Sequence, residues 1–179
     1  MSWAGWCAIV FVGPGLHARE RAGGDRIKVL VDADACPVKE EILRATRRAG
    51  AALLFFIDTA HALRPDYGEV VTVATGHDSV DYALLSRVAP GDIVVTQDYG
   101  LAAMALAKGG RAIHPSGLVY DATNIDALLA ERHRSAKIRR GGGRTKGPRK
   151  RTDEDDARFA AAFAALLADA IRDCNGGKG

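Results

Sequence analysis

Short apolar runs alternate with amphipathic segments along most of the chain. The apolar runs occupy residues 28–32, 52–58, 69–74, 92–98 and 111–115. Helical spacing of apolar residues is found between them, at residues 38–50, 78–88 and 99–110. Near-continuous apolar strands that alternate with helices are typical of a parallel sheet covered on both faces. The pattern therefore predicts an α/β fold with a mostly parallel central sheet.

The C-terminal part of the chain has a different pattern. A helix is predicted for residues 124–133, followed by a basic segment with several Gly and Pro residues, 134–151, which we call the basic strap. In the last segment, 152–173, Thr152 and Asp155 have the spacing of a capping box. Its apolar residues share one helical face, which predicts a helix docked on the domain: Phe159, Phe163, Leu166, Leu167, Ala170 and Ile171.

Residues 1–26 are set apart from the α/β domain at residues 27–133. Their apolar run, WAGWCAIVFVGPG, imitates part of a secretory signal, but no Lys or Arg precedes it and Gly and Pro interrupt it. We expect a loosely ordered extension. No stretch reaches the ~20 apolar residues of a membrane span. Three widely spaced cysteines support neither a disulfide framework nor a zinc ribbon, so we expect a cytoplasmic protein.

Charge is unevenly distributed along the chain. The whole sequence holds 25 Lys and Arg against 22 Asp and Glu, a net charge of +3. Ten of the basic residues, and no acidic ones, lie between Arg132 and Arg151, so the rest of the chain is acidic. A basic segment of this kind is typical of contact with nucleic-acid phosphates, and a solvated linker is the alternative. The candidate nucleic-acid-binding residues are Arg139, Arg140, Arg144, Lys146, Arg149 and Lys150.

Aspartates gather where the predicted strands end. Asp32 and Asp34 follow the first strand, Asp78 and Asp81 begin a helix, and Asp98 follows the fourth strand. In parallel sheets the ligand site lies beyond the carboxyl ends of the strands. Two carboxylates 4 Å apart repel by roughly 4 kcal/mol at an effective dielectric of 20, and a divalent cation removes that cost. We therefore predict a shared acidic site that binds Mg²⁺ or Mn²⁺, since hard cations prefer oxygen ligands.

Each aspartate also has a structural interpretation. Asp78 and Asp98 precede helices and could be N-caps, and Asp34 could stabilise the turn before Pro37. Asp32 ends a buried strand and Asp81 falls inside a helix, where capping does not apply. The shared site is thus the better interpretation of the set.

Four further residues are site candidates. Thr96 and Gln97 flank Asp98 and could bind a phosphate or orient a water, and His61 lies near a strand end. Cys36 precedes a helix, where a thiol can have a lowered pKa, but no second cysteine or histidine is fixed near it by spacing. A structural thiol is the favoured interpretation for Cys36.

The motifs resemble a known family over about Ile27 to Ile171. VDADACPVKEEI, GHDSVDYAL, VVTQDYGLAAMALAKG and the segments GRTKGP and TDEDDARF are similar to the YaiI/YqxD family of uncharacterised bacterial proteins. That family is itself similar to PIN-like domains, whose nucleases bind Mg²⁺ or Mn²⁺ through an acid after the first strand, one on a central helix and one in a Thr-x-Asp element. Those positions match Asp32, Asp81 and Asp98. The resemblance implies a PIN-like three-layer fold.

The resulting expectation is a Mg²⁺- or Mn²⁺-dependent nuclease that acts on RNA. Asp32, Asp81 and Asp98 would hold the metal, Asp34 or Asp78 would orient the attacking water, and the basic strap would hold phosphates. One alternative is a nucleic-acid or ribosome-associated binding protein without catalysis, in which the acids are caps or a structural site. Another is a small-molecule phosphatase, although no conventional Gly-rich phosphate loop or cap domain is visible.

Overall fold

The apolar runs form the strands of one sheet. The computed structural model describes residues 26–34, 36–74, 76, 78–140 and 149–176. In this part of the chain six strands pair in the order β3-β2-β1-β4-β5-β6. Their bounds are Lys28–Asp32 (β1), Ala52–Asp58 (β2), Glu69–Val73 (β3), Ile93–Val95 (β4), Arg111–Ile113 (β5) and Val119–Tyr120 (β6). All neighbours are parallel except β6, which is antiparallel to β5.

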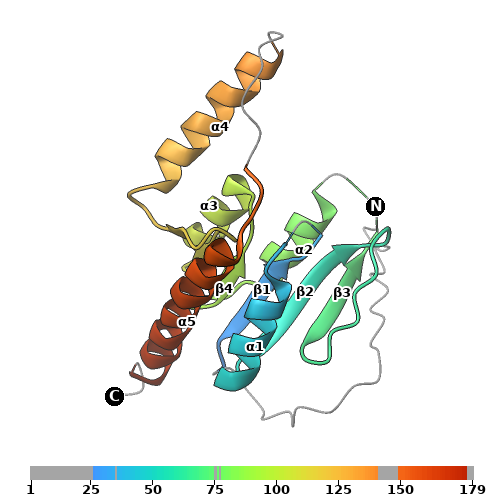
Figure 1. Ribbon diagram of the computed structural model, residues 1–179, viewed down its shortest axis with the longest axis vertical. Coiled ribbons are helices and arrows are strands. Elements are labelled where there is room, and N and C mark those ends of the chain that lie inside the picture. Colours follow the sequence, from blue (N-terminus) through green and yellow to red (C-terminus); the bar gives the residue numbers. More distant parts are fainter. Residues whose placement is uncertain (1–25, 35, 75, 77, 141–148, 177–179) are drawn as a thin grey trace, which may run out of the picture.

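The described residues form five helices, and both faces of the sheet have helices packed on them (Figure 1). They are α1 (Lys39–Ala49), α2 (Ser79–Arg87), α3 (Tyr99–Ala107), α4 (Ile125–Arg140) and α5 (Asp153–Gly176). Because side chains alternate along a strand, Val31 and Phe55 pack in one core with α1 and α5, while Leu30 and Phe56 pack in a second core with α2 and α3. The predicted α/β fold, with helices on both sides of a mostly parallel sheet, is confirmed.

Helix α5 docks on the first of these cores. At its start, Thr152 Oγ1 and backbone N–H both donate to Asp155 Oδ2 at 3.0 Å, so the predicted capping box is formed. Phe159 and Phe163 are fully buried and stacked, with ring centroids 5.5 Å apart. The predicted docking face is therefore confirmed, and α5 lies beside α1 over the sheet (Figure 1).

Glycine ends α1 where the sequence predicts. Gly50 has φ +63° and its N–H donates to the carbonyl of Arg47, while the N–H of Ala51 donates to the carbonyl of Thr46. This left-handed C-terminal turn satisfies the last carbonyls of the helix, and glycine adopts it without strain. The chain then enters β2 directly.

The boundary predicted between helix and basic strap was wrong. Helix α4 does not end at His133 but continues to Arg140, and in Figure 1 it projects beyond the α/β body. The reason lies in the sequence, because residues 134–140 contain no Gly or Pro and are mostly good helix formers. Arg139 and Arg140 thus lie in α4. Residues 141–148, including Arg144 and Lys146, lie outside the described residues.

Strand β6 was not predicted either. It contains only Val119 and Tyr120, and a strand of this length is too short to be recognised from the alternation of apolar and polar residues. The predicted extension at residues 1–26 lies outside the described residues except for Arg26. None of the helices in the described ranges has the length and apolar character that crossing a membrane requires.

One buried aspartate has a structural role at the amino edge of the sheet. Asp92 is 3% exposed and accepts hydrogen bonds from the backbone N–H groups of Lys28 (2.9 Å) and Ala89 (2.8 Å). Its Oδ2 also forms an ion pair with Lys28 Nζ at 2.9 Å. The carboxylate therefore joins β1 to the turn that leads into β4, and all of its charge is compensated locally.

Replacing Phe163 by Ala tests the docking of α5. Because the ring is fully buried between α5 and the sheet, we expect the free energy of unfolding in urea to fall by about 3–5 kcal/mol. Ala165 is exposed on the same helix, and Ala165→Ser should cost about 0.5 kcal/mol. A loss below about 1 kcal/mol for Phe163→Ala would contradict the docked position of α5 in solution.

Candidate functional site

The candidate site begins at the carboxyl ends of β1 and β4, where the strand order reverses. Asp32 ends β1, and Thr96 follows β4 in the adjacent position. Thr96 Oγ1 donates to Asp32 Oδ2 at 3.0 Å and accepts the backbone N–H of Asp98 at 3.0 Å. The buried hydroxyl thus fixes Asp32 relative to Asp98. This is the position at which open α/β sheets bind ligands.

Asp98 is both a helix cap and a member of this edge. Its Oδ1 accepts the backbone N–H groups of Gly100 (2.7 Å) and Leu101 (3.2 Å), as an N-cap of α3 does. Its Oδ2 accepts a hydrogen bond from Arg132 Nη1 of α4 at 2.7 Å. The capping alternative for Asp98 is therefore confirmed, yet the second oxygen faces a charged partner at the site.

Asp81 comes from the first turn of α2. Burial, followed by the charges of Asp32, Asp98 and Asp78, raises the pKa of Asp81 to about 6. Burial also raises the pKa of Asp32, against the hydrogen bond from Thr96. The acids at this edge are thus close enough to disfavour one another's ionised forms, and a cation is the natural partner for such a group.

The pKa of Asp98 is shifted in the opposite direction to the pKa values of Asp32 and Asp81. Burial alone would raise its pKa, but the hydrogen bonds from Arg132 and from the N–H groups of Leu101 and Gly100 outweigh burial, and the pKa lies below its ordinary value. The edge therefore contains one carboxylate held in its charged form and two, Asp32 and Asp81, whose charged forms are disfavoured.

The five predicted acids do not all meet at one point. Asp32, Asp81 and Asp98 share the edge. In the described part of the chain, however, only Asp34, Asp58 and His61 form a group of three potential metal ligands whose ligand atoms all lie within 4.8 Å of one another. Asp78 is exposed, has φ +60° and makes no side-chain cap bond to α2, so the capping interpretation of its side chain was wrong. Gln97 is exposed between Thr96 and Asp98.

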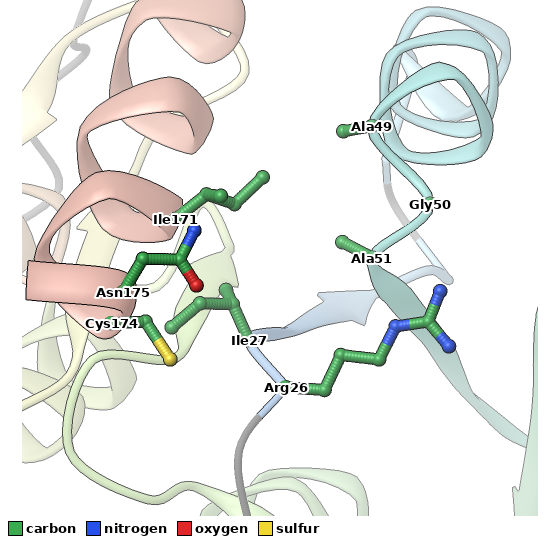
Figure 2. A pocket seen from close by; sticks show the side chains of 8 residues that line it. All are labelled: Arg26, Ile27, Ala49, Gly50, Ala51, Ile171, Cys174 and Asn175. Atoms are coloured by element: carbon green, nitrogen blue, oxygen red, sulfur yellow. The ribbon is translucent and has the colours of Figure 1, made fainter. Parts of the chain in front are cut away.

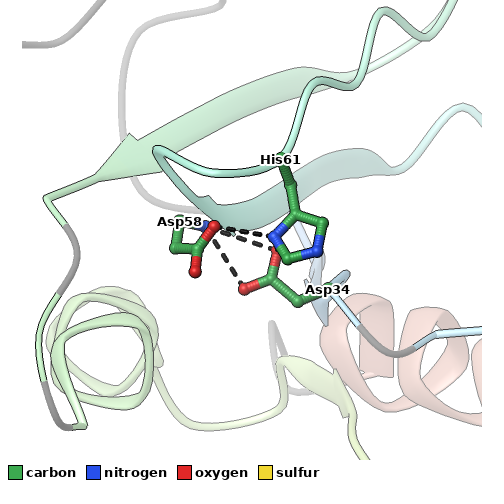
Figure 3. A group of neighbouring side chains, drawn as sticks. All are labelled: Asp34, Asp58 and His61. Atoms are coloured by element: carbon green, nitrogen blue, oxygen red, sulfur yellow. Dashed lines mark hydrogen bonds and ion pairs between the residues drawn. The ribbon is translucent and has the colours of Figure 1, made fainter.

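Asp34 turns toward β2 and not toward the helix after it (Figure 3). Both of its oxygens accept the backbone N–H of Asp58, at 3.3 and 3.2 Å. His61 Nδ1 lies 2.7 Å from Asp58 Oδ1 and 3.2 Å from Asp34 Oδ1. The side chain of Asp34 therefore joins the ends of β1 and β2. Its predicted support of the turn before Pro37 involves residue 35, which lies outside the described residues.

Sequence reasoning missed Asp58. It ends β2, the strand adjacent and parallel to β1, so the argument that selected Asp32 applied to it equally. His61 follows three residues later in the loop. The hydrogen bond with His61 lowers the pKa of Asp58, and the same bond, aided by the charge of Asp34, raises the pKa of His61.

Cys36 is a buried thiol. It is 5% exposed, and burial raises its pKa to about 11, the reverse of what a reactive thiolate needs. Cys36 and Cys174 are both free of disulfides. Lys39 Nζ donates to the carbonyl of Cys36 at 2.7 Å, while the thiol of Cys36 belongs to the core.

The basic strap is described at both ends, since residues 134–140 continue α4 and residues 149–151 lead into α5. Arg149 pairs with Asp155 of α5 at 2.6 Å, and Lys150 is exposed. Arg151 pairs with Asp156 and donates to the carbonyl of Pro115 at 2.8 Å. The residues that lead into α5 therefore use part of their charge to fix the start of that helix.

Two hollows lie near these elements. One, of about 110 Å³, is formed at the amino edge of the sheet by Ile27, the turn at Ala49–Ala51 and the end of α5, and it contains no carboxylate (Figure 2). The other, of about 330 Å³, lies between α1 and the loop after β2 and includes Lys39, Leu63 and Arg64. Only the second is near the carboxyl edge.

Comparisons with known proteins give a consistent result. A model of the family described as "Uncharacterized BCR, YaiI/YqxD family" matches residues 30–169. A UPF0178 protein of Exiguobacterium sibiricum is 50% identical over 141 residues, which cover 79% of this chain and 96% of that protein. A UPF0178 protein of Ruminiclostridium cellulolyticum is 51% identical over 141 residues, covering 79% and 92%. No solved structure matches the chain, so the similarity to PIN-like domains stays a prediction.

Asp81→Asn and Asp98→Asn should change stability in opposite directions. Because the pKa of Asp81 is raised in the folded protein, the stability that its protonated form contributes is present below about pH 4 and is lost as the pH rises toward 6. In metal-free buffer at pH 7, Asp81→Asn should therefore raise the free energy of unfolding by about 1 kcal/mol, after a discount for solvent screening. The gain should disappear near pH 4. Urea denaturation at several pH values measures it.

Because the pKa of Asp98 is lowered, its contribution to the free energy of unfolding changes with pH in the opposite direction to that of Asp81. Its ionised form contributes stability above its unfolded pKa, so Asp98→Asn should be less stable than wild type at pH 7 and approach it as the pH falls below about 4. Asp173→Asn, an exposed pair partner of Arg111, should change stability by less than about 1 kcal/mol at either pH. Equal signs for Asp81→Asn and Asp98→Asn would show that the edge does not have this charge arrangement.

Proposed function

The chain belongs to the YaiI/YqxD family, and we propose that it is a divalent-cation-dependent nuclease that acts on RNA. The observation that carries the proposal is the convergence of carboxylates from three elements at one sheet edge. Asp32 comes from β1, Asp81 from α2 and Asp98 from the start of α3, and their charges act on one another. Asp92, whose role is structural, is paired with two N–H donors and a lysine, whereas Asp81 is acted on by the charges of other carboxylates that disfavour its ionised form.

The donor set suits a hard cation. All three side chains offer carboxylate oxygens, which Mg²⁺ and Mn²⁺ prefer, while the thiol of Cys36 is buried in the core and burial raises its pKa. When bound, such a cation supplies charge neutralisation and an activated water. The protein's part is to hold the acids, and the Thr96 hydroxyl does this for Asp32 through its 3.0 Å hydrogen bond.

Two further side chains fit roles around these acids. Asp78 is exposed and acts electrostatically on Asp81, so we assign it the orientation of the attacking water. Asp34, the other candidate for this role, is directed at Asp58 and His61. The side chain of Arg132 is 51% exposed beside Asp98, where its guanidinium can bind the phosphate whose ester bond is cleaved.

The position of α4 supports a nucleic acid as the substrate class. Arg132, which contacts Asp98, is followed on α4 by Arg134, Lys137, Arg139 and Arg140. The basic sequence continues through Arg144 and Lys146. A phosphate backbone that followed this helix would reach the acidic edge at Arg132. Contacts of this kind are made to phosphates and need no base recognition.

Binding without catalysis is a second candidate, and one observation favours it. Asp98 has two backbone N–H donors and Arg132, so this carboxylate is satisfied with no cation. In that case α4 and the basic strap would be the functional part. RNA binding that survives Asp32→Asn, with no cleavage under any metal, would favour this candidate.

Cleavage assays test the catalytic proposal. Purified protein with single-stranded and structured RNAs in Mn²⁺ should give products, and Asp32→Asn and Asp98→Asn should each lower the rate by about 100-fold or more, since losing a cation ligand removes several kcal/mol of transition-state stabilisation. Asp173→Asn, on α5 and paired with Arg111 of β5, is the matched control and should cleave like wild type. Undiminished cleavage by Asp98→Asn would overturn the assignment.

Salt dependence tests the contribution of α4. The logarithm of RNA affinity should fall linearly with the logarithm of salt concentration, and the double change Arg139→Ala and Arg140→Ala should reduce the slope by about 1.4, or roughly 0.7 for each lost contact to a single strand. Fluorescence anisotropy with a labelled RNA measures this slope. Arg172→Ala on α5, which removes an exposed charge paired with Asp169, should leave the slope unchanged. An unchanged slope in the α4 variant would exclude this path.

A further inference from the structure

We propose that Asp34, Asp58 and His61 bind a divalent transition-metal cation such as Zn²⁺, Co²⁺ or Mn²⁺, at a site separate from Asp32, Asp81 and Asp98. The three side chains offer two carboxylate oxygens and one imidazole nitrogen, and these ligand atoms lie within 4.8 Å of one another (Figure 3). A cation at about 2.0–2.2 Å from each ligand requires separations between ligand atoms of at most ~4.4 Å. The geometry is thus within a small side-chain adjustment of coordination.

The backbone already holds the two carboxylates in place. β1 and β2 pair through Asp32 and Phe56, and the N–H of Ala33 donates to the carbonyl of Phe56 at 3.0 Å, which continues the pairing beyond the strand end. The N–H of Asp58 then donates to Asp34. Each carboxylate oxygen has further lone pairs, so this bond orients Asp34 without using up its capacity as a ligand.

The site lies next to the acidic edge and uses different side chains, although the charge of Asp34 acts on Asp32. β1 pairs with β2 on one side and with β4 on the other. Asp32 is tied toward the β4 side by Thr96, whereas Asp34 is tied toward the β2 side by Asp58. The two groups therefore flank the end of the same strand, with Asp34 belonging to the second.

The imidazole nitrogen determines which cations fit. Mg²⁺ prefers six oxygen ligands and keeps several waters, while Zn²⁺, Co²⁺ and Mn²⁺ accept imidazole together with carboxylate. The Nδ1 atom of His61 faces both acids, and this nitrogen must give up its proton to coordinate. Binding should therefore strengthen from pH 5.5 to pH 7.5.

Three protein ligands leave a coordination position open. The side chain of His61 is 53% exposed, so solvent reaches the group. The hollow of about 330 Å³ is lined by Lys39, Leu63 and Arg64, and Leu63 follows His61 by two positions in the chain. Lys39 also acts electrostatically on His61. A site with three protein ligands and one open position is the arrangement of catalytic zinc centres, and structural centres have four. The cationic side chains beside it suit an anionic fourth ligand.

Metal titrations of the untagged, EDTA-treated full chain test the inference. Isothermal titration with Zn²⁺ and the visible spectrum of Co²⁺ should report one site that Asp58→Asn and His61→Ala each weaken at least tenfold. His133→Ala, an exposed histidine on α4, is the matched control and should bind like wild type. Far-ultraviolet circular dichroism confirms that each variant is folded, which is expected because His61 is on the surface.

The outcomes separate this inference from the proposed nuclease. Zn²⁺ or Co²⁺ binding retained in Asp32→Asn and Asp98→Asn, but lost in His61→Ala, supports the second site whether or not RNA is cleaved. Binding that His61→Ala leaves intact while Asp32→Asn abolishes it overturns the inference and supports the acidic edge alone. No binding by wild type at pH 7.5, with lower stability in His61→Ala, would also overturn it and leave His61 as a hydrogen-bonded tie between β1 and β2.

Discussion

The parallel pairing of β1 with both of its neighbours is the constraint on which the rest of the molecule depends. β1 is paired with β2 over its whole length and with β4 over Val29 to Val31, in register, so all three strands end at the same edge. Apolar side chains alone occupy the interiors of β1, β2 and β4, so polar groups can be concentrated only at the ends of these strands and in the segments that adjoin them. Asp32 and Asp58 are the last residues of β1 and β2, and Thr96 directly follows β4. His61 lies in the loop after β2, so all of these side chains are found at the carboxyl edge.

The charged side chains at the two edges of the sheet have different surroundings. At the amino edge, Asp92 is enclosed by two N–H donors and the Lys28 ammonium, and its charge serves the fold. At the carboxyl edge, Asp32 and Asp81 face other carboxylates, and their charged forms are disfavoured. A stable protein retains such repulsion only if something else compensates for it, which is why the second edge and not the first is interpreted as the functional one.

Most of the fold could be predicted from the sequence, because it depends on local patterns. The apolar runs, the Gly50 stop and the Phe159–Phe163 face each require only a few neighbouring residues to recognise. The positions of the aspartates at strand ends and a helix start predicted the shared edge, and the family resemblance singled out Asp32, Asp81 and Asp98, whose charges act on one another in the structure. The partners of Asp34 could not be predicted, because Asp58 and His61 lie 24 and 27 positions away and become neighbours only through the pairing of β1 with β2.

The hydrogen bond between Arg132 and Asp98 has a consequence for the whole of α4. Any cation that takes Oδ2 of Asp98 must compete with the guanidinium, so the free energy of that ion pair is subtracted from the cation's affinity. By reciprocity, the cation weakens the hold of α4 on the α/β body by the same amount. Occupancy of the acidic edge and the attachment of the basic helix are therefore thermodynamically linked through a single side chain, and the helix that supplies the positive charge is held most firmly when the edge is empty.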